Sequence, residues 1–67
     1  FRVAGIRNSQ AAVARRYNVV LSVENRGSKI NVYVRPKKEL SKAEIDSLRK
    51  AIRSELGLAP QDSIIFR

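Results

Sequence analysis

Apolar and polar residues alternate along two neighbouring segments in the middle of the chain. The apolar positions are Val19, Leu21 and Val23 in the first segment, and Ile30, Val32 and Val34 in the second. Alternation with a period of two is typical of a strand that buries one face. The two segments therefore predict an antiparallel β-hairpin with one apolar face and one polar face.

The turn of this hairpin is predicted at Arg26-Gly27, because a loop of two or four residues centred there sets apolar residues opposite one another. A three-residue loop would place Val23 opposite Asn31 and break the pattern. The expected cross-strand pairs are Val23 with Ile30, Leu21 with Val32, Val19 with Val34, Glu24 with Lys29, and Val20 with Tyr33.

Local signals define a helix over residues 42–56. Ser41 and Glu44 have the spacing of a capping box, in which each side chain accepts a hydrogen bond from the other residue's backbone. Gly57 supplies the left-handed residue that ends many helices, and Pro60 blocks continuation. The apolar stripe of this helix comprises Ile45, Leu48, Ile52 and Leu56. A short strand over residues 63–67 follows, and we expect it to lie beside the hairpin.

The first third of the chain has a weaker pattern. Asn8 or Ser9 is suited to cap a short helix that runs through residues 11–17, and Asn18 would end it in a left-handed turn. The residues expected to face inward are Ile6, Val13 and Tyr17. Residues 1–7 fit either a short strand or an extended lead-in.

The expected order is therefore helix, strand, strand, helix, strand, with an open question about one strand in front. This order predicts a two-layer α+β sandwich in which a three-stranded sheet carries two helices on one face. Residues 1–67 form one small domain, because a second core cannot be built from 67 residues. Since the chain begins at Phe1 rather than Met, we expect a domain excised from a longer polypeptide.

The composition excludes several kinds of chemistry. The chain has no Cys and no His, so it offers no thiol nucleophile, no imidazole base and no zinc-finger ligands. Its four Glu and two Asp are scattered and form no dense cation cage. We therefore expect that the protein is not an enzyme and has no catalytic residue. We also expect it to bind no metal, no cofactor and no small-molecule substrate.

The basic residues of the second helix form a stripe. Lys42, Arg49 and Arg53 fall in one line beside the apolar stripe, with Lys50 at its margin and Asp46 as the sole acid among them. The chain as a whole has 14 Lys and Arg against 6 Asp and Glu, a formal net charge of +8. The stripe fits either a docking surface for phosphate, anionic lipid or an acidic protein, or an ordinary solvated helix face.

The polar face of the hairpin offers a second candidate surface. Val20, Tyr33 and Arg35 lie on it, with no element predicted to cover them. They fit half of a protein interface, and the alternative is a Val–Tyr pair that only stabilises the hairpin. Sheets that bind RNA stack bases on two or three aromatic side chains, so one Tyr gives little support for that mode.

The second half of the chain resembles ring-building motif domains. These occur in the flagellar MS-ring protein, in inner-ring proteins of type III secretion systems and in sporulation channel proteins. In that family a strand runs into Leu-Ser at a helix start, and the helix ends in Gly-Leu-x-Pro before a strand of the form D/N-x-[IV]-x-[VIF]. Here the matching residues are Leu40-Ser41, Gly57-Leu58-Ala59-Pro60 and the strand after Gln61 that begins at Asp62. The resemblance covers about residues 19–67, and departs in the short first helix and the tight hairpin.

The resemblance implies a non-catalytic assembly module that packs side by side with its neighbours to form a ring around a secretion channel at a membrane, on the extracytoplasmic side. The partners it implies are other copies or a neighbouring ring protein. Subunits at +8 repel one another, so we expect an acidic protein surface or anionic lipid beside them, and a monomer when the domain is isolated.

Two other functions remain open at this point. The first is a small KH-like nucleic-acid-binding domain, since the net charge and the basic stripe are common footprints of phosphate binding. Residues 5–8 stand where a phosphate-gripping loop would be, although they lack its second Gly. The second is a regulatory dimerisation domain of a membrane transporter, which uses the same element order.

Overall fold

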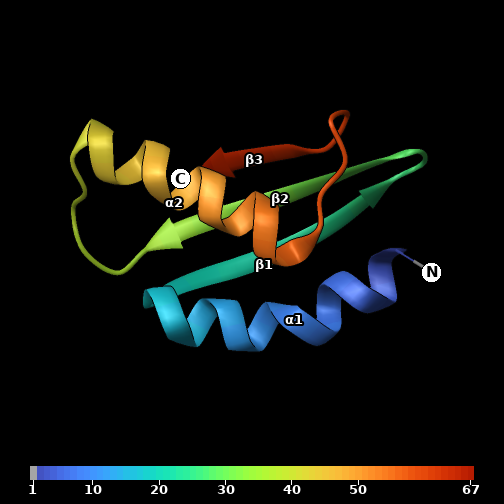
Figure 1. The fold of residues 1–67 in the computed structure, drawn as a ribbon, viewed down its shortest axis with the longest axis horizontal. Coiled ribbons are helices and arrows are strands. Elements are labelled where there is room, and N and C mark those ends of the chain that lie inside the picture. The colour runs from blue at the N-terminus through green and yellow to red at the C-terminus, as the bar shows by residue number, and fades with distance from the viewer. Residues whose placement is uncertain (1) are drawn as a thin grey trace.

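The computed structural model describes residues 2–67, and side chains from residue 5 onward. Its elements are α1 (Arg2–Tyr17), β1 (Val19–Arg26), β2 (Lys29–Pro36), α2 (Lys42–Leu56) and β3 (Ser63–Phe66). Figure 1 shows α1 running alongside β1, while α2 crosses in front of the other strands. The predicted order of helix, strand, strand, helix, strand is confirmed.

The three strands form one open mixed sheet in the order β1-β2-β3. β1 and β2 pair antiparallel as a hairpin, and β3 returns parallel to β2 after α2. Strand residues on one face pack against both helices, whereas the opposite face is uncovered. The buried core comprises Ile6, Val13, Val19, Leu21, Ile30, Val32, Val34, Leu48, Ile52, Leu56 and Ile64. The α+β sandwich with both helices on one face is thus as predicted.

The register of the hairpin differs from the prediction by two residues. Leu21 lies opposite Val34, and the loop consists of Gly27 and Ser28 alone. The first residue of this turn, Gly27, has φ +62. Glycine adopts a positive φ without steric cost, which favours a two-residue turn that begins at Gly27. A shift of two residues keeps the same side chains on the buried face, so the alternating pattern does not distinguish the two registers.

The open question about residues 1–7 is settled by α1. The 16-residue helix begins at Arg2, so the expectation of a strand or an extended lead-in is wrong for residues 2–7, while Phe1 lies outside the described residues. Asn8 and Ser9 lie inside the helix and do not cap it. Burial of Ile6 against the sheet stabilises these first turns, because tertiary packing supplies most helix stability.

The inward face of α1 is as predicted. Ile6 and Val13 are buried and Tyr17 is half-buried against the core. Asn18 has φ 55 and turns the chain into β1, in the left-handed conformation expected of it.

The bounds and caps of α2 are confirmed. The Ser41 Oγ accepts a hydrogen bond from the Glu44 N–H at 3.2 Å, and a Glu44 carboxylate oxygen accepts one from the Ser41 N–H at 3.0 Å. The bond from the Ser41 N–H is the largest of the effects that hold the pKa of Glu44 below its ordinary value. Gly57 adopts the left-handed conformation at the end of the helix, and the Leu58 N–H bonds back to the Arg53 carbonyl at 3.0 Å.

A buried carboxylate fastens the loop after α2 to the sheet. Asp62 is 3% exposed, and its Oδ1 accepts from the Ile30 N–H at 2.9 Å. Its Oδ2 accepts from the Ala59 N–H at 2.8 Å. The Arg53 guanidinium donates to the carbonyls of Ala59 and Asp62 at 2.9 and 3.0 Å. The loop that delivers β3 is therefore held from both β2 and α2.

Replacing the Asp62 carboxylate tests how much it contributes to the stability of the fold. Asp62→Ala leaves two backbone N–H groups without their acceptor in the loop and at the start of β2, so we expect the free energy of unfolding to fall by about 3 kcal/mol. Urea denaturation followed by circular dichroism measures it. Asp46→Ala, at an exposed position of α2, is the matched control and should change stability by less than about 0.5 kcal/mol. Equal losses in the two variants would contradict the role given to Asp62.

Candidate functional site

The uncovered face of the sheet is the first candidate surface. We call it the open sheet face, and it comprises Val20, Ser22, Glu24, Asn31, Tyr33, Arg35, Ser63, Ile65 and Arg67. Val20 is 48% exposed and Ile65 is 37% exposed, and they are the exposed large hydrophobic side chains among residues 5–67. Both therefore lie on the same side of the molecule.

One end of the open sheet face is hollowed. A depression of about 380 Å³ is lined by Val20, Ser22, Tyr33, Val34, Arg35 and Arg67. Register explains the gathering, because Val20 lies opposite Arg35 and Ser22 lies opposite Tyr33. The Arg67 guanidinium stacks on the Tyr33 ring, with its carbon 4.3 Å from the ring centroid.

Glu24 is the acidic residue of this face, and two neighbouring side chains bind its carboxylate. The Tyr33 hydroxyl donates to its Oε1 at 2.8 Å, and the Arg26 guanidinium lies 3.1 Å from the same oxygen. These two bonds lower the pKa of Glu24 below its ordinary value, the bond from Tyr33 having the larger effect. The carboxylate therefore stays charged and oriented along the sheet.

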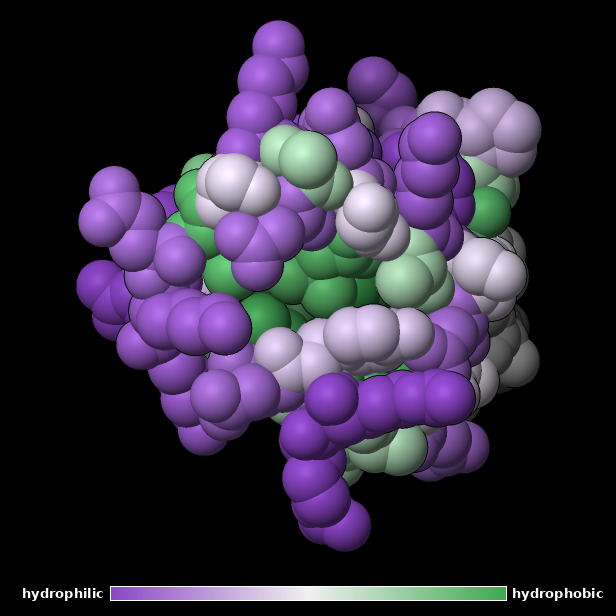
Figure 2. Space-filling view, turned by 60° about the vertical axis from the view of Figure 1, so that its left-hand side comes forward, coloured by the Kyte–Doolittle hydropathy of each residue, from purple (hydrophilic) through white to green (hydrophobic). Residues whose placement is uncertain are grey.

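The second candidate surface is an apolar groove between the two helices. We call it the helix groove, and its volume is about 630 Å³. It is lined by Arg16, Tyr17, Lys38, Leu40, Ala43, Glu44, Ser47, Leu48 and Ala51. Figure 2 shows a hydrophobic hollow on this side of the molecule, ringed by hydrophilic side chains.

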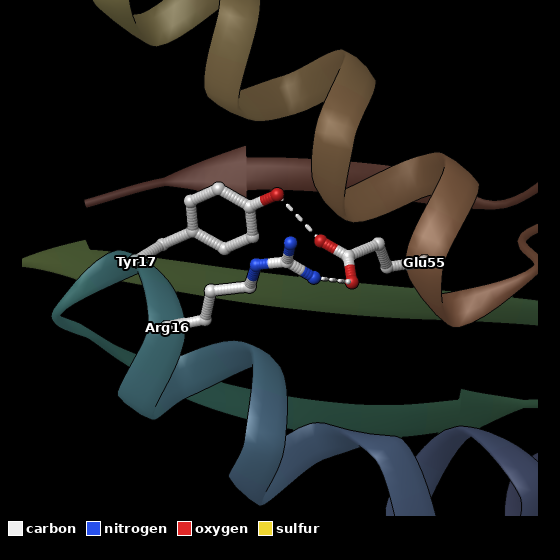
Figure 3. Close-up of polar contacts among 3 residues, drawn as sticks. All are labelled: Arg16, Tyr17 and Glu55. Carbon is white, nitrogen blue, oxygen red and sulfur yellow. Dashed lines mark hydrogen bonds and ion pairs between the residues drawn. The ribbon is translucent and has the colours of Figure 1, made fainter.

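A polar cluster ties the two helices together beside this groove (Figure 3). The Tyr17 hydroxyl donates to the Glu55 Oε2 at 2.5 Å, and the Arg16 Nη1 lies 3.0 Å from its Oε1. The hydrogen bond to Glu55 raises the pKa of Tyr17 above its ordinary value of 10.0. A single carboxylate of α2 thus binds two consecutive residues of α1.

The raised pKa gives this tie a defined pH dependence. A raised pKa means that the stabilisation is fully present below pH 10.0 and is lost as pH rises through the folded-state pKa of Tyr17. Tyr17→Phe should therefore lower the thermal unfolding midpoint at pH 7, and the gap from the parent protein should narrow above pH 10. Calorimetry across this range measures both.

The Glu55→Ala background, which removes the acceptor of the Tyr17 hydroxyl, is the control for that experiment. Because the tie runs through the Glu55 carboxylate, Tyr17→Phe should have a smaller effect on stability in this background than in the parent chain. An effect of the same size in both backgrounds would show that Tyr17 acts through ring packing alone.

The predicted basic stripe divides into two groups. Lys42 and Lys50 are exposed on α2. Arg49 instead donates to the Ile64 carbonyl at 3.3 Å and lies over the Phe66 ring at 5.2 Å. Arg53 is half-buried on the loop carbonyls described above. Two of the four predicted binding cations therefore have a role inside the fold.

The predicted residues of the hairpin come together as one surface. Val20, Tyr33 and Arg35 all line the hollow of the open sheet face. The prediction omitted Ile65 and Arg67, although alternation along β3 places both on the face opposite the buried Ile64. It also omitted the helix groove, whose residues are brought together only by the packing of α1 on α2.

The phosphate-gripping loop considered for residues 5–8 is not formed. These residues lie within α1, and the helical backbone bonds of this segment leave no loop to surround an anion. Among residues 5–67 the acidic side chains form no group of three that could hold a metal ion.

No protein-family profile, curated protein or solved structure matches the chain. The resemblance of residues 19–67 to ring-building motif domains therefore stays a prediction from the motifs. Neither described helix has the length and apolar character that crossing a bilayer requires.

Proposed function

We propose that this domain is a non-catalytic protein–protein assembly module of a membrane-associated secretion or sporulation ring. The observation that carries the proposal is the open sheet face. One face of the sheet holds the core, whereas the other has no cover and presents Val20 and Ile65. A small domain that leaves such a face open gains apolar burial when a neighbouring subunit covers it.

The two candidate surfaces lie on different layers of the sandwich, which suits a ring. A contact around a ring joins two different surfaces of neighbouring subunits, which are copies of one chain or two different ring proteins. The open sheet face and the helix groove are two such surfaces, one on the sheet layer and one on the helix layer. The element order also agrees with the order that the motif resemblance implies.

The charge of the domain sets a condition on this assembly. At a net charge of +8, copies repel one another, and contacts between copies alone must overcome that repulsion. We expect the isolated 67-residue domain to sediment as a monomer at moderate salt. Analytical ultracentrifugation measures this, and a stable dimer or ring of the isolated domain would count against the condition.

The role of the open sheet face in assembly is tested in the full-length protein. Val20→Glu puts a charge on the most exposed large apolar side chain of that face, so we expect it to reduce the assembled fraction in sedimentation or native electrophoresis. Val20 is half exposed, so the variant should still fold.

Ala11→Glu is the matched control, because it adds the same charge at an exposed position of α1. It should leave assembly as in the parent protein. Normal assembly of a folded Val20→Glu variant would show that the open sheet face is not part of the assembly interface.

A further inference from the structure

We infer that the open sheet face binds an acidic segment of a different protein, with a carboxylate held between Arg35 and Arg67 and an apolar side chain against Val20. The inference rests on the proposed function, since it assumes that this face is an interface. It adds the chemistry of the partner, which on this face is a neighbouring protein of different sequence rather than a second copy of the chain.

The two arginines are placed as a pair. β2 and β3 run parallel with Val34 beside Phe66, so Arg35 and Arg67 are the next residues of the two neighbouring chains. The Arg67 N–H bonds to the Val34 carbonyl at 2.9 Å and fixes the backbone at this point. Both side chains line the same hollow.

The guanidinium of Arg67 is oriented before any ligand arrives. Its carbon lies over the Tyr33 ring, 4.3 Å from the centroid, and a guanidinium held over a ring face keeps N–H groups at its edge with which to donate. A planar donor fork held in place matches the two oxygens of a carboxylate. The hydroxyl of Ser22, which lies opposite Tyr33, adds a further donor to the hollow.

No carboxylate within residues 5–67 forms an ion pair with Arg35 or Arg67. The ion pairs formed within residues 5–67 join Arg16 to Glu55 and Arg26 to Glu24. Glu24 is also bound by Tyr33, so the one acid of the open sheet face is used at the other end of the face. The side chains that line the hollow therefore carry two positive charges and no negative one.

A second copy is poorly suited to supply the carboxylate. Of the six acids, Asp62 is buried, and Glu24, Glu44 and Glu55 are held by internal hydrogen bonds. The other two are surrounded by cations of the same chain. Glu39 follows Lys37 and Lys38, and Asp46 lies one helical turn from Lys42, Arg49 and Lys50. Docking either one would bring like charges onto Arg35 and Arg67.

An acidic protein segment fits the hollow better than single-stranded nucleic acid does. Binding of single strands depends on aromatic rings on which bases stack. Tyr33 is the aromatic residue of the open sheet face, and Arg67 already covers its ring while Glu24 accepts from its hydroxyl. The exposed Val20 and Ile65 instead suit the apolar side chains of a peptide.

The test uses a synthetic peptide of alternating Glu and Val as the probe, titrated into the isotope-labelled 67-residue domain. We expect the amide signals of Ser22, Tyr33 and Arg35 to shift in NMR spectra. Replacing both Arg35 and Arg67 with Ala should weaken binding by about tenfold or more, because two charge-assisted contacts are lost.

The matched control replaces Arg7 and Arg15 with Ala, two exposed residues of α1, and so removes the same charge. It should weaken binding by less than about threefold, through the loss of diffuse attraction. Arg35→Ala alone, at an exposed residue of β2, keeps the test valid if the double variant does not fold.

Three results would overturn the inference. The first is an equal loss of affinity in the two double variants, which would mean diffuse attraction of any anion. The second is signal shifts that map to the helix groove. The third is an oligouridylate that binds the same hollow more tightly than the peptide, which would favour nucleic acid.

The assembly and peptide-binding experiments together distinguish a wrong proposed function from a wrong inference about the partner. Normal assembly of the folded Val20→Glu protein, combined with peptide binding at Arg35 and Arg67, would remove the ring role and leave an acidic-peptide site. Loss of assembly in Val20→Glu without peptide binding would keep the interface and remove its acidic partner.

Discussion

The buried carboxylate of Asp62 is the interaction on which the rest of the architecture depends. The loop after α2 must reverse the chain and deliver β3 parallel to β2, and it has only six residues for this. Both oxygens of Asp62 accept backbone N–H groups, one from the loop and one from the start of β2. Arg53 binds the carbonyls of the same loop from α2. Without this fixed loop there is no third strand, and the hollow of the open sheet face would lose Arg67.

Each outer edge of the sheet carries a side-chain donor. The Gln10 side-chain amide donates to the Leu21 carbonyl at 2.7 Å on β1, and Arg49 donates to the Ile64 carbonyl on β3. Unpaired strand edges invite pairing with other chains, and polar or charged side chains placed along them oppose it. The helices thus cover the core face and also partly satisfy the edges. What stays available to a partner is the face of the sheet rather than its ends.

The sequence predicted most reliably what local chemistry decides. Ser41, Glu44 and Gly57 fix both ends of α2 by bonds within a few residues, and the structure has the helix at the predicted bounds. The start of α1 and the hairpin register depend on packing instead. Ile6 has no local cap nearby and becomes helical through burial, and the register depends on which residue takes the strained position of the turn.

The same division holds for the candidate site. Alternation along the hairpin placed Val20, Tyr33 and Arg35 on one face, because side-chain direction in a strand follows from sequence. The helical projection likewise placed Arg49 and Arg53 beside the apolar stripe, but it carries no information about which backbone carbonyls lie within their reach. The number of basic residues therefore overestimates the cations available for binding, because Arg49 and Arg53 hydrogen-bond backbone carbonyls within the domain.

The two-residue turn at Gly27-Ser28 has a consequence at the far end of the hairpin. Eight residues separate Gly27 from Arg35, about 26 Å along a strand. The turn sets Arg35 beside Val20, whereas the register expected from the apolar pattern would have set Tyr33 there. A turn moved by one residue along the chain would keep the same side chains on each face and change which of them are cross-strand neighbours. In this fold the position of the turn therefore decides which side chains stand together on a surface that the turn never touches.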